Sequence, residues 1–203
     1  MCFDTETSLL AWSLSYSIAF FLYFRNRGYD RWNAAFIISF ATIQLLEAGL
    51  WSNLENPDIN SLFTRLVLLV LLTQPLVQTF MGYKSTKSEL LFYSSIVFCI
   101  ILIYGLYRIT QGTFTSTIGP NGHLVWTSSE YPSNFLGPSW VTILYLLGLM
   151  VPLLFMKEYR GIPLLLVGLG TFAYNLKYSS SGEFGSMWCF SAVIYSILAL
   201  FVN

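Results

Sequence analysis

Apolar residues occur in seven long runs along this chain, and short polar or basic segments separate them. Each run approaches or reaches the roughly 20 residues that an α-helix needs to span a lipid bilayer. In order, the runs are about Ser8–Phe24, Trp32–Trp51, Leu62–Met81, Leu90–Tyr107, Trp140–Met156, Ile162–Leu176 and Phe184–Val202. The pattern predicts an all-helical, seven-span transmembrane bundle that forms one domain over residues 1–203.

The basic residues are distributed unevenly between the connecting loops. Only Arg65, Arg108 and Lys177 fall on one predicted side of the membrane. The other seven of the ten lie in the first, third and fifth loops: Arg25, Arg27, Arg31, Lys84, Lys87, Lys157 and Arg160. Because basic loops stay on the cytosolic side, the predicted topology has the N-terminus outside and the C-terminus inside. "Outside" here means the non-cytosolic face.

Residues 109–138 form the one long loop, and this topology places it outside. Alternating threonine and apolar residues flank Gly119-Pro120-Asn121-Gly122, a combination typical of a tight turn. The loop is therefore predicted to form a small β-hairpin over the outer mouth of the bundle. The alternative is a loop without regular structure.

The composition supports a membrane protein. Hydrophobic residues make up 55% of the chain and charged residues only 10%, against about 25% charged in soluble domains, and the mean hydropathy is +0.62. The lipid bilayer is therefore the expected partner. The net charge is zero, so no basic field attracts nucleic acid, and no nucleic-acid partner is expected. Asp4 and Glu6 precede the first run without any Lys or Arg, and no cleavable signal peptide is predicted.

Gln44, Glu47 and Trp51 are three and four residues apart, so they share one face of the second predicted helix. A carboxylate within the membrane costs at least about 2.5–3.5 kcal/mol unless it is paired. We therefore expect this face to point into the bundle and Glu47 to pair with Arg65 or Lys177. Two interpretations remain open: a structural ion pair, and a carboxylate that binds a cation or relays a proton.

Gln74 and Gln78 share a face of the third predicted helix. They either line a polar path or hydrogen-bond across helices, as intramembrane glutamines commonly do.

The cysteines leave several alternatives open. Cys2 and Cys189 are both predicted at the outer membrane edge, where they could form a disulfide, a reactive or metal-chelating thiol site, or no site at all. Cys99 lies in the middle of an apolar run and is interpreted as packing. With a single histidine, His123, and no Cys-x-x-Cys pair, no zinc site and no cofactor is predicted.

The polar residues within the spans converge on the outer half of the predicted bundle. They predict a ligand- or ion-binding pocket built from Glu47, Gln44, Arg65, Trp51, Trp188, Cys189 and Cys2. The leading hypothesis is transport or binding of an unidentified small solute or ion. The alternatives are an intramembrane enzyme that depends on a thiol or a metal, and a structural or assembly protein. No reaction follows from these residues.

The sequence resembles a family of small, uncharacterised multi-span membrane proteins with bacterial and large-DNA-virus members. The family pattern comprises a Met-Cys-Phe start, a Gln-x-x-Glu-x-x-x-Trp helix and a Ser-x-Trp-Cys motif in the last helix. Here the matching positions are Cys2, Gln44, Glu47, Trp51, Ser186, Trp188 and Cys189. Asp4 and Met187 depart from the commoner residues, Ser and Leu. The resemblance implies a shared fold and residue set, and it implies no chemistry.

Overall fold

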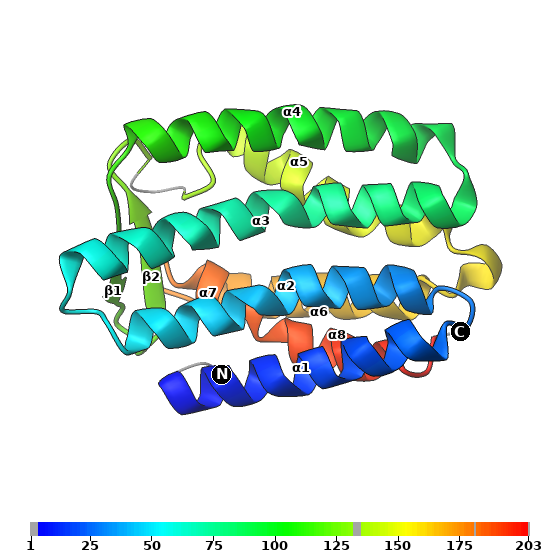
Figure 1. Cartoon of the computed structure of the whole chain (residues 1–203), viewed down its shortest axis with the longest axis horizontal. Coiled ribbons are helices and arrows are strands. Elements are labelled where there is room, and N and C mark those ends of the chain that lie inside the picture. The colour runs from blue at the N-terminus through cyan, green and yellow to red at the C-terminus, as the bar shows by residue number, and fades with distance from the viewer. Residues whose placement is uncertain (1–3, 132–134, 181, 203) are drawn as a thin grey trace.

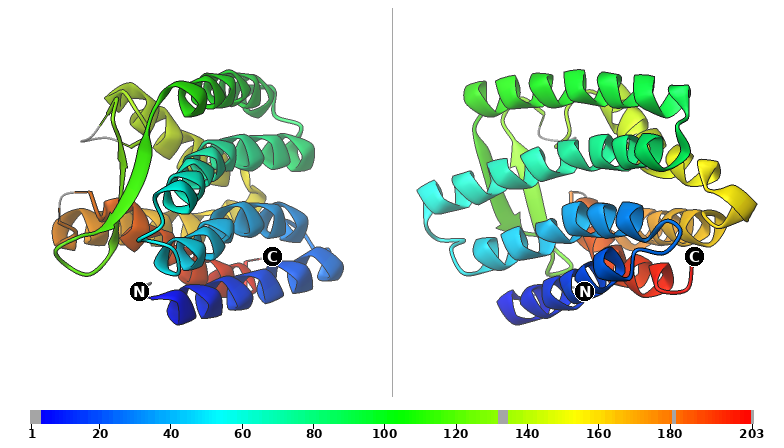
Figure 2. Two further views of the ribbon diagram at one scale, coloured as in Figure 1. Left: turned by 60° about the vertical axis from the view of Figure 1, so that its left-hand side comes forward. Right: turned by 45° about the vertical axis from the view of Figure 1, so that its right-hand side comes forward.

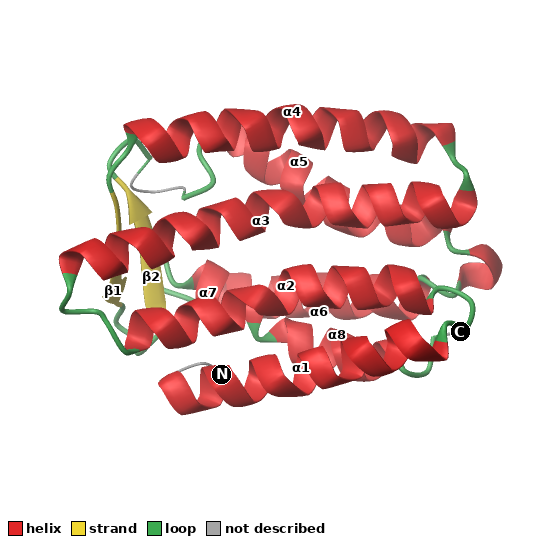
Figure 3. Cartoon of the chain, viewed as in Figure 1, coloured by secondary structure: helices red, strands yellow, loops and turns green. Residues whose placement is uncertain are grey.

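The computed structural model describes residues 4–131, 135–180 and 182–202, and they are mostly helical (Figure 3). The α-helices are α1 (Thr5–Arg25), α2 (Asp30–Trp51), α3 (Pro57–Thr86), α4 (Glu89–Gln111), α5 (Ser139–Met150), α6 (Ile162–Tyr178), α7 (Phe184–Cys189) and α8 (Ser191–Ala199). Two short 3₁₀ helices, η1 (Val151–Phe155) and η2 (Lys157–Tyr159), follow α5. The strands β1 (Phe114–Ile118) and β2 (Leu124–Ser128) pair antiparallel.

The long helices lie side by side along the longest axis of the molecule (Figure 1). The hairpin lies at one end, with the start of α1 and the α2–α3 connection. The α1–α2 and α3–α4 connections and the segment between α5 and α6 lie at the other end. Figure 2 shows the hairpin at the same end of the bundle from two further directions. This arrangement places all the loops predicted to be cytosolic at the end opposite the hairpin.

Local sequence signals explain where the first helices begin and end. The Asp4 carboxylate accepts a hydrogen bond from the Thr7 amide at 2.7 Å and so caps α1. Asn56 caps α3 in the same way, followed by Pro57 in the first turn. Asn26 and Lys87 adopt left-handed conformations just after α1 and α3, which ends each helix before the next begins.

The four long helices α1 to α4 are each long and apolar enough to cross a membrane. The last three predicted runs also form helices, and two of them are interrupted. Pro152 lies where the fifth run changes from α5 to η1, and Phe190 separates α7 from α8 in the seventh. The sixth run forms α6 as one helix. The sequence located the helices of the described residues correctly but missed these breaks.

The core is centred on α2, which is buried over most of its length and packs against α1, α3, α7 and α8. By contrast, α4 buries only one narrow face and exposes large apolar side chains such as Ile100 and Ile103. Apolar side chains on the outer face of a helix are typical of contact with lipid rather than water.

Candidate functional site

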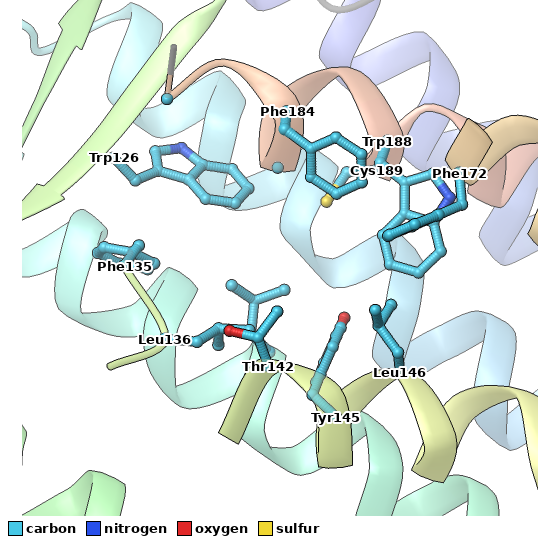
Figure 4. A pocket seen from close by; sticks show the side chains of 13 residues that line it. Trp126, Phe135, Leu136, Thr142, Tyr145, Leu146, Phe172, Phe184, Trp188 and Cys189 are labelled. Atoms are coloured by element: carbon cyan, nitrogen blue, oxygen red, sulfur yellow. The ribbon is translucent and has the colours of Figure 1, made fainter. Parts of the chain in front are cut away.

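A cavity of about 210 Å³ lies near the hairpin end of the bundle, between β2, α5, α6 and α7 (Figure 4). Its walls are mainly aromatic. The side chains that define it are Trp126, Phe135, Tyr145, Phe172, Phe184 and Trp188, with Thr142 and Cys189 as its polar and thiol groups. In Figure 4, Thr142 and Tyr145 project from α5 toward the side of the cavity formed by α7, where the Cys189 sulfur lies. An apolar space with a few polar groups is the usual form of a small-molecule site.

Trp188 is the residue on which the aromatic wall is assembled. Its ring centre lies 5.5 Å from that of Phe172 and 5.9 Å from that of Phe184. Its indole nitrogen donates to the Thr171 hydroxyl at 3.2 Å, which fixes the ring against α6. These edge and tilted contacts are favourable aromatic geometries, so the wall between α6 and α7 is held in one arrangement.

The hairpin contributes Trp126 to the wall of the cavity. The strands are in register with Ser116 opposite Trp126, and both residues are buried. Trp126 packs against Phe135 with 5.8 Å between ring centres. Because alternate residues of a strand face the same side, the buried residues of β2 form one face directed into the bundle.

The hairpin is attached to α3 through Asn60. The Asn60 side chain accepts from the Ser116 amide at 2.8 Å and donates to the Ser116 carbonyl at 2.9 Å. The hydroxyls of Thr64 and Ser116 lie 2.7 Å apart. The amide of Asn60 thus reproduces the pairing that a neighbouring strand would make with β1.

On its other side, the hairpin is attached through Glu183, which directly precedes α7. The buried Glu183 carboxylate accepts from the Asn121 amide at 2.8 Å, from the His123 amide at 3.4 Å, and from the Ser180 hydroxyl. Burial alone raises the pKa of Glu183, but these hydrogen bonds outweigh it and place the pKa below its ordinary value. Burial also lowers the pKa of His123, and the negative charge of Glu183 opposes that shift.

Gln74 and Gln78 both hydrogen-bond across helices. Gln74 accepts from the Tyr145 hydroxyl at 2.6 Å, and its amide lies 3.4 Å from the Ser39 carbonyl. Gln78 accepts from the Trp32 indole at 2.9 Å and donates to the Leu149 carbonyl at 3.2 Å. The two alternatives for these glutamines were a polar path and hydrogen bonds between helices. The structure contains the hydrogen bonds, which join α2, α3 and α5.

The predicted face of α2 points toward α7 and α8. Phe36 and Phe40 lie on it, 5.0 Å from Tyr195 and 5.9 Å from Trp188 between ring centres. Gln44 and Glu47 continue this stripe toward the hairpin end at intervals of four and three residues, and both are completely buried. The structure therefore places Gln44 and Glu47 on the stripe that packs against the helices carrying Trp188 and Cys189.

Other predicted residues lie apart from this stripe. Arg65 donates to the Gly112 carbonyl at 3.3 Å, and its guanidinium lies 5.8 Å from the Phe114 ring centre. Lys177 lies over Tyr178. The ion pairs recorded between described residues join Arg25 with Asp30, Arg108 with Glu130, and Arg160 with Glu158. The expected pair of Glu47 with Arg65 or Lys177 is not among them.

Of the six predicted site residues that the structure describes, Trp188 and Cys189 line the cavity and the other four do not. Trp51 ends α2 at the hairpin end and is half-buried. Cys2 lies outside the described residues, and the predicted pairing of Cys2 with Cys189 lies outside them too. The two described cysteines, Cys99 and Cys189, form no disulfide with each other. In the described part of the chain, no three His, Cys, Asp or Glu side chains come together as metal ligands would.

The sequence reasoning missed Tyr145, Phe172, Asn60 and Glu183. The first two are ordinary aromatic residues of apolar helices, and only the packing of α5 and α6 directs them into one cavity. Glu183 offered a signal, since it is an acidic residue that directly precedes a predicted helix, the position at which an acidic side chain stabilises a helix start.

A scan against family models and comparisons with curated proteins and with solved structures find no match for this chain. The resemblance described above therefore stays a prediction.

Proposed function

We propose that the chain is an integral membrane protein that crosses the bilayer seven times. Four helices have the length and apolarity to span a membrane. The segments Ser139–Phe155 and Phe184–Ala199 are shorter apolar helices, and α6 lies between them. Exposed apolar side chains such as Leu10, Ile103 and Phe201, each more than 60% exposed, support contact with lipid along the outside of the bundle.

The proposed orientation places the hairpin end on the non-cytosolic side. The seven basic residues of the first, third and fifth loops all belong to the opposite end, where Arg25 forms a two-pronged ion pair with the buried Asp30. An excess of basic residues in short loops marks the cytosolic side. A cysteine introduced at Ile118, on the hairpin, tests this orientation by labelling with a thiol reagent that does not cross the membrane. The orientation is refuted if the reagent labels this cysteine only when it is added from the cytosolic side.

For function, we propose binding of a small apolar or amphipathic molecule in the aromatic cavity. The observation that carries this proposal is the cavity itself, at about 210 Å³ with mainly apolar walls. An engineered apolar cavity of about 150 Å³ in another protein binds benzene, so this one has room for a somewhat larger ring system. The hydroxyl of Thr142 and the thiol of Cys189 supply the few polar contacts that would orient such a molecule.

Binding accounts for the geometry better than transport of a polar solute. A polar path through the bundle would need groups free to exchange hydrogen bonds with the solute. Gln74 and Gln78, two fully buried polar residues of α3, are instead engaged in bonds between helices. Those bonds favour a structural role for the two glutamines.

The test uses the purified full chain in lipid nanodiscs and 1-bromonaphthalene, whose heavy atom quenches tryptophan fluorescence on contact. We expect a saturable quenching component from Trp126 and Trp188, above the linear background of probe dissolved in lipid. Cys189→Phe fills the cavity and should abolish that component. Cys99→Phe adds the same ring at an exposed position of α4 and should leave it unchanged. Quenching that never saturates in the wild-type protein would refute the proposal.

A second candidate function, an intramembrane thiol-dependent enzyme, is favoured by one observation: the Cys189 sulfur faces the cavity. A thiol that serves as a nucleophile must be reachable by its substrate. Alkylation by N-ethylmaleimide, followed by mass spectrometry, tests this. Faster reaction at Cys189 than at Cys99, blocked by 1-bromonaphthalene, would support it, and an inert Cys189 would exclude it.

A further inference from the structure

The hairpin is fastened on two sides by contacts of different kinds. On the α3 side, Asn60 makes two backbone hydrogen bonds to Ser116 in the middle of β1, and Thr64 adds a third contact. On the α7 side, the Glu183 carboxylate accepts from the backbone amides of Asn121 and His123 in the turn between the strands, and the Asn121 side chain adds a long contact of 3.4 Å to the Tyr178 carbonyl. The α3 side is therefore a strand-like attachment, whereas the α7 side is held by side-chain contacts to the turn, in which Glu183 makes the shortest hydrogen bond.

The seam between the hairpin and α7 is also the edge of the cavity. Trp126 of β2 lines one side of the seam, and Gly182, Phe184 and Gly185 line the other. Separation of the turn from Glu183 would move Trp126 away from Phe184 and open the cavity toward the outer aqueous side. Separation at β1 would break the Asn60 pairing without opening this edge.

Two glycines make the seam close-fitting. A Cβ atom at Gly119 would lie 2.3 Å from the Glu183 carboxylate oxygen, and one at Gly182 would lie 2.6 Å from a methyl group of Val125. Gly182 has a φ of +88°, which other residues rarely adopt. The two surfaces thus touch closely at these two positions. Among the described residues, no hydrogen bond joins the β2 residues Leu124 to Ser128 to α7. Contact of this kind can separate without breaking a strand ladder.

We propose that the β-hairpin is a lid on the cavity, hinged at Asn60 and latched by Glu183, and that the bound molecule enters from the outer aqueous side when the latch releases. This inference rests on the proposed binding function. It adds the route of access and identifies Glu183 as the residue that controls it.

A reversible cross-link tests the lid directly. An ideal Cβ at position 182 lies 3.7 Å from the Cβ of Val125, within the range of about 3.5–4.5 Å that a disulfide requires. In Val125→Cys/Gly182→Cys, oxidation should join β2 to the segment before α7, and reduction should release it. The association rate of 1-bromonaphthalene is measured by stopped-flow quenching in nanodiscs, with oxidised and reduced wild-type protein and the single variant Gly182→Cys as controls.

We expect the oxidised double variant to bind the probe at least about tenfold more slowly than its reduced form, with no such difference in the controls. Glu183→Ala should act in the opposite direction and raise the rate about tenfold, since one charge-assisted hydrogen bond changes an equilibrium by that order. Glu158→Ala removes an exposed carboxylate at the opposite end and should change nothing. The Glu183→Ala comparison decides the question if the double variant does not fold.

An oxidised double variant that binds at the rate of its reduced form would overturn the lid and indicate access from within the bilayer between helices. An unchanged rate in Glu183→Ala would overturn the latch. These outcomes leave the proposed binding function standing. Absence of saturable binding in every form, wild type included, would instead refute the binding function and remove the lid with it.

Discussion

Removal of the Tyr145 hydroxyl tests how strongly the polar groups within the bundle hold α5 to α3. Tyr145 is buried on α5, and its hydroxyl donates to the Gln74 side-chain oxygen at 2.6 Å. The substitution Tyr145→Phe keeps the ring and the shape of the cavity wall. It removes one donor and leaves the Gln74 oxygen buried without that partner.

The expected loss follows from what Gln74 retains. In water-soluble proteins, a buried group that loses its partner costs about 1–3 kcal/mol. In membrane proteins, hydrogen bonds between helices average about 0.6 kcal/mol and reach about 1.7 kcal/mol. The short Tyr145 contact and the long 3.4 Å contact from Gln74 to Ser39 place this bond toward the upper part of that range. We expect Tyr145→Phe to lower the free energy of unfolding by about 1.5 kcal/mol.

The assay is the free energy of unfolding in bicelles, measured by steric trapping, for the two single variants Tyr145→Phe and Gln74→Leu and for the double variant. The double variant should be less destabilised than the sum of the singles by about 1 kcal/mol, because the second change removes the stranded partner. Tyr107→Phe, an exposed tyrosine on α4, is the matched control and should lie within about 0.5 kcal/mol of wild type. If the loss of unfolding free energy in the double variant equals the sum of the two single losses within about 0.3 kcal/mol, the hydrogen bond does not couple these helices, and the reasoning is refuted.

Three further predictions test the packing, the latch and the basic end. Gly148→Ala should destabilise the bundle by about 1–3 kcal/mol in the same assay, because its Cβ would lie 2.3 Å from Phe98, whereas Gly170→Ala, with nothing within 4 Å, should be neutral or stabilising. Equal effects would contradict the packing. The hairpin should loosen in two steps on acidification, read as faster amide exchange. Burial disfavours the charged form of His123 and lowers its pKa, so the hairpin should lose stability as the pH drops below 6.5, the ordinary histidine value. The hydrogen bonds that lower the pKa of Glu183 give stability that is complete above pH 4.5, the ordinary glutamate value, and is lost as the pH falls further. His123→Gln should abolish only the first step, and a persistent first step would exclude His123 as its source. Arg25→Lys should lower the unfolding free energy by about 1–2 kcal/mol, since lysine cannot keep the two-pronged pair to the buried aspartate. An unchanged value would show that the two-pronged geometry does not contribute to stability.

The helices were the part of the fold most open to prediction. Lipid cannot hydrogen-bond to the backbone, so an apolar run long enough to span it has little choice but to form a helix. The hairpin in the 109–138 loop was predicted from its turn residues, and the structure confirms it as β1 and β2. Turn chemistry is local, so the residues around Gly119 and Gly122 were sufficient.

The candidate site was only partly open to prediction. The intervals between Gln44 and Glu47 correctly indicated a buried helix face, since periodicity along one helix is a local property. The partner expected for Glu47 was a long-range inference. Arg65 lies instead near Phe114 and the Gly112 carbonyl, because the first half of α3 packs against the hairpin.

By itself, the sequence determined that the chain is rich in apolar helices, that its basic loops alternate with non-basic ones, and that one loop turns back as a hairpin. Each of these depends on composition or on residues within a few positions of one another. Tertiary structure alone decided that Trp126, Tyr145, Phe172 and Trp188, which belong to four separate elements, enclose one cavity. It also decided that Glu183 holds the turn of a hairpin about 60 residues earlier in the chain. Such contacts arise from how the helices pack, and packing depends on the shapes of all the faces together rather than on any one segment.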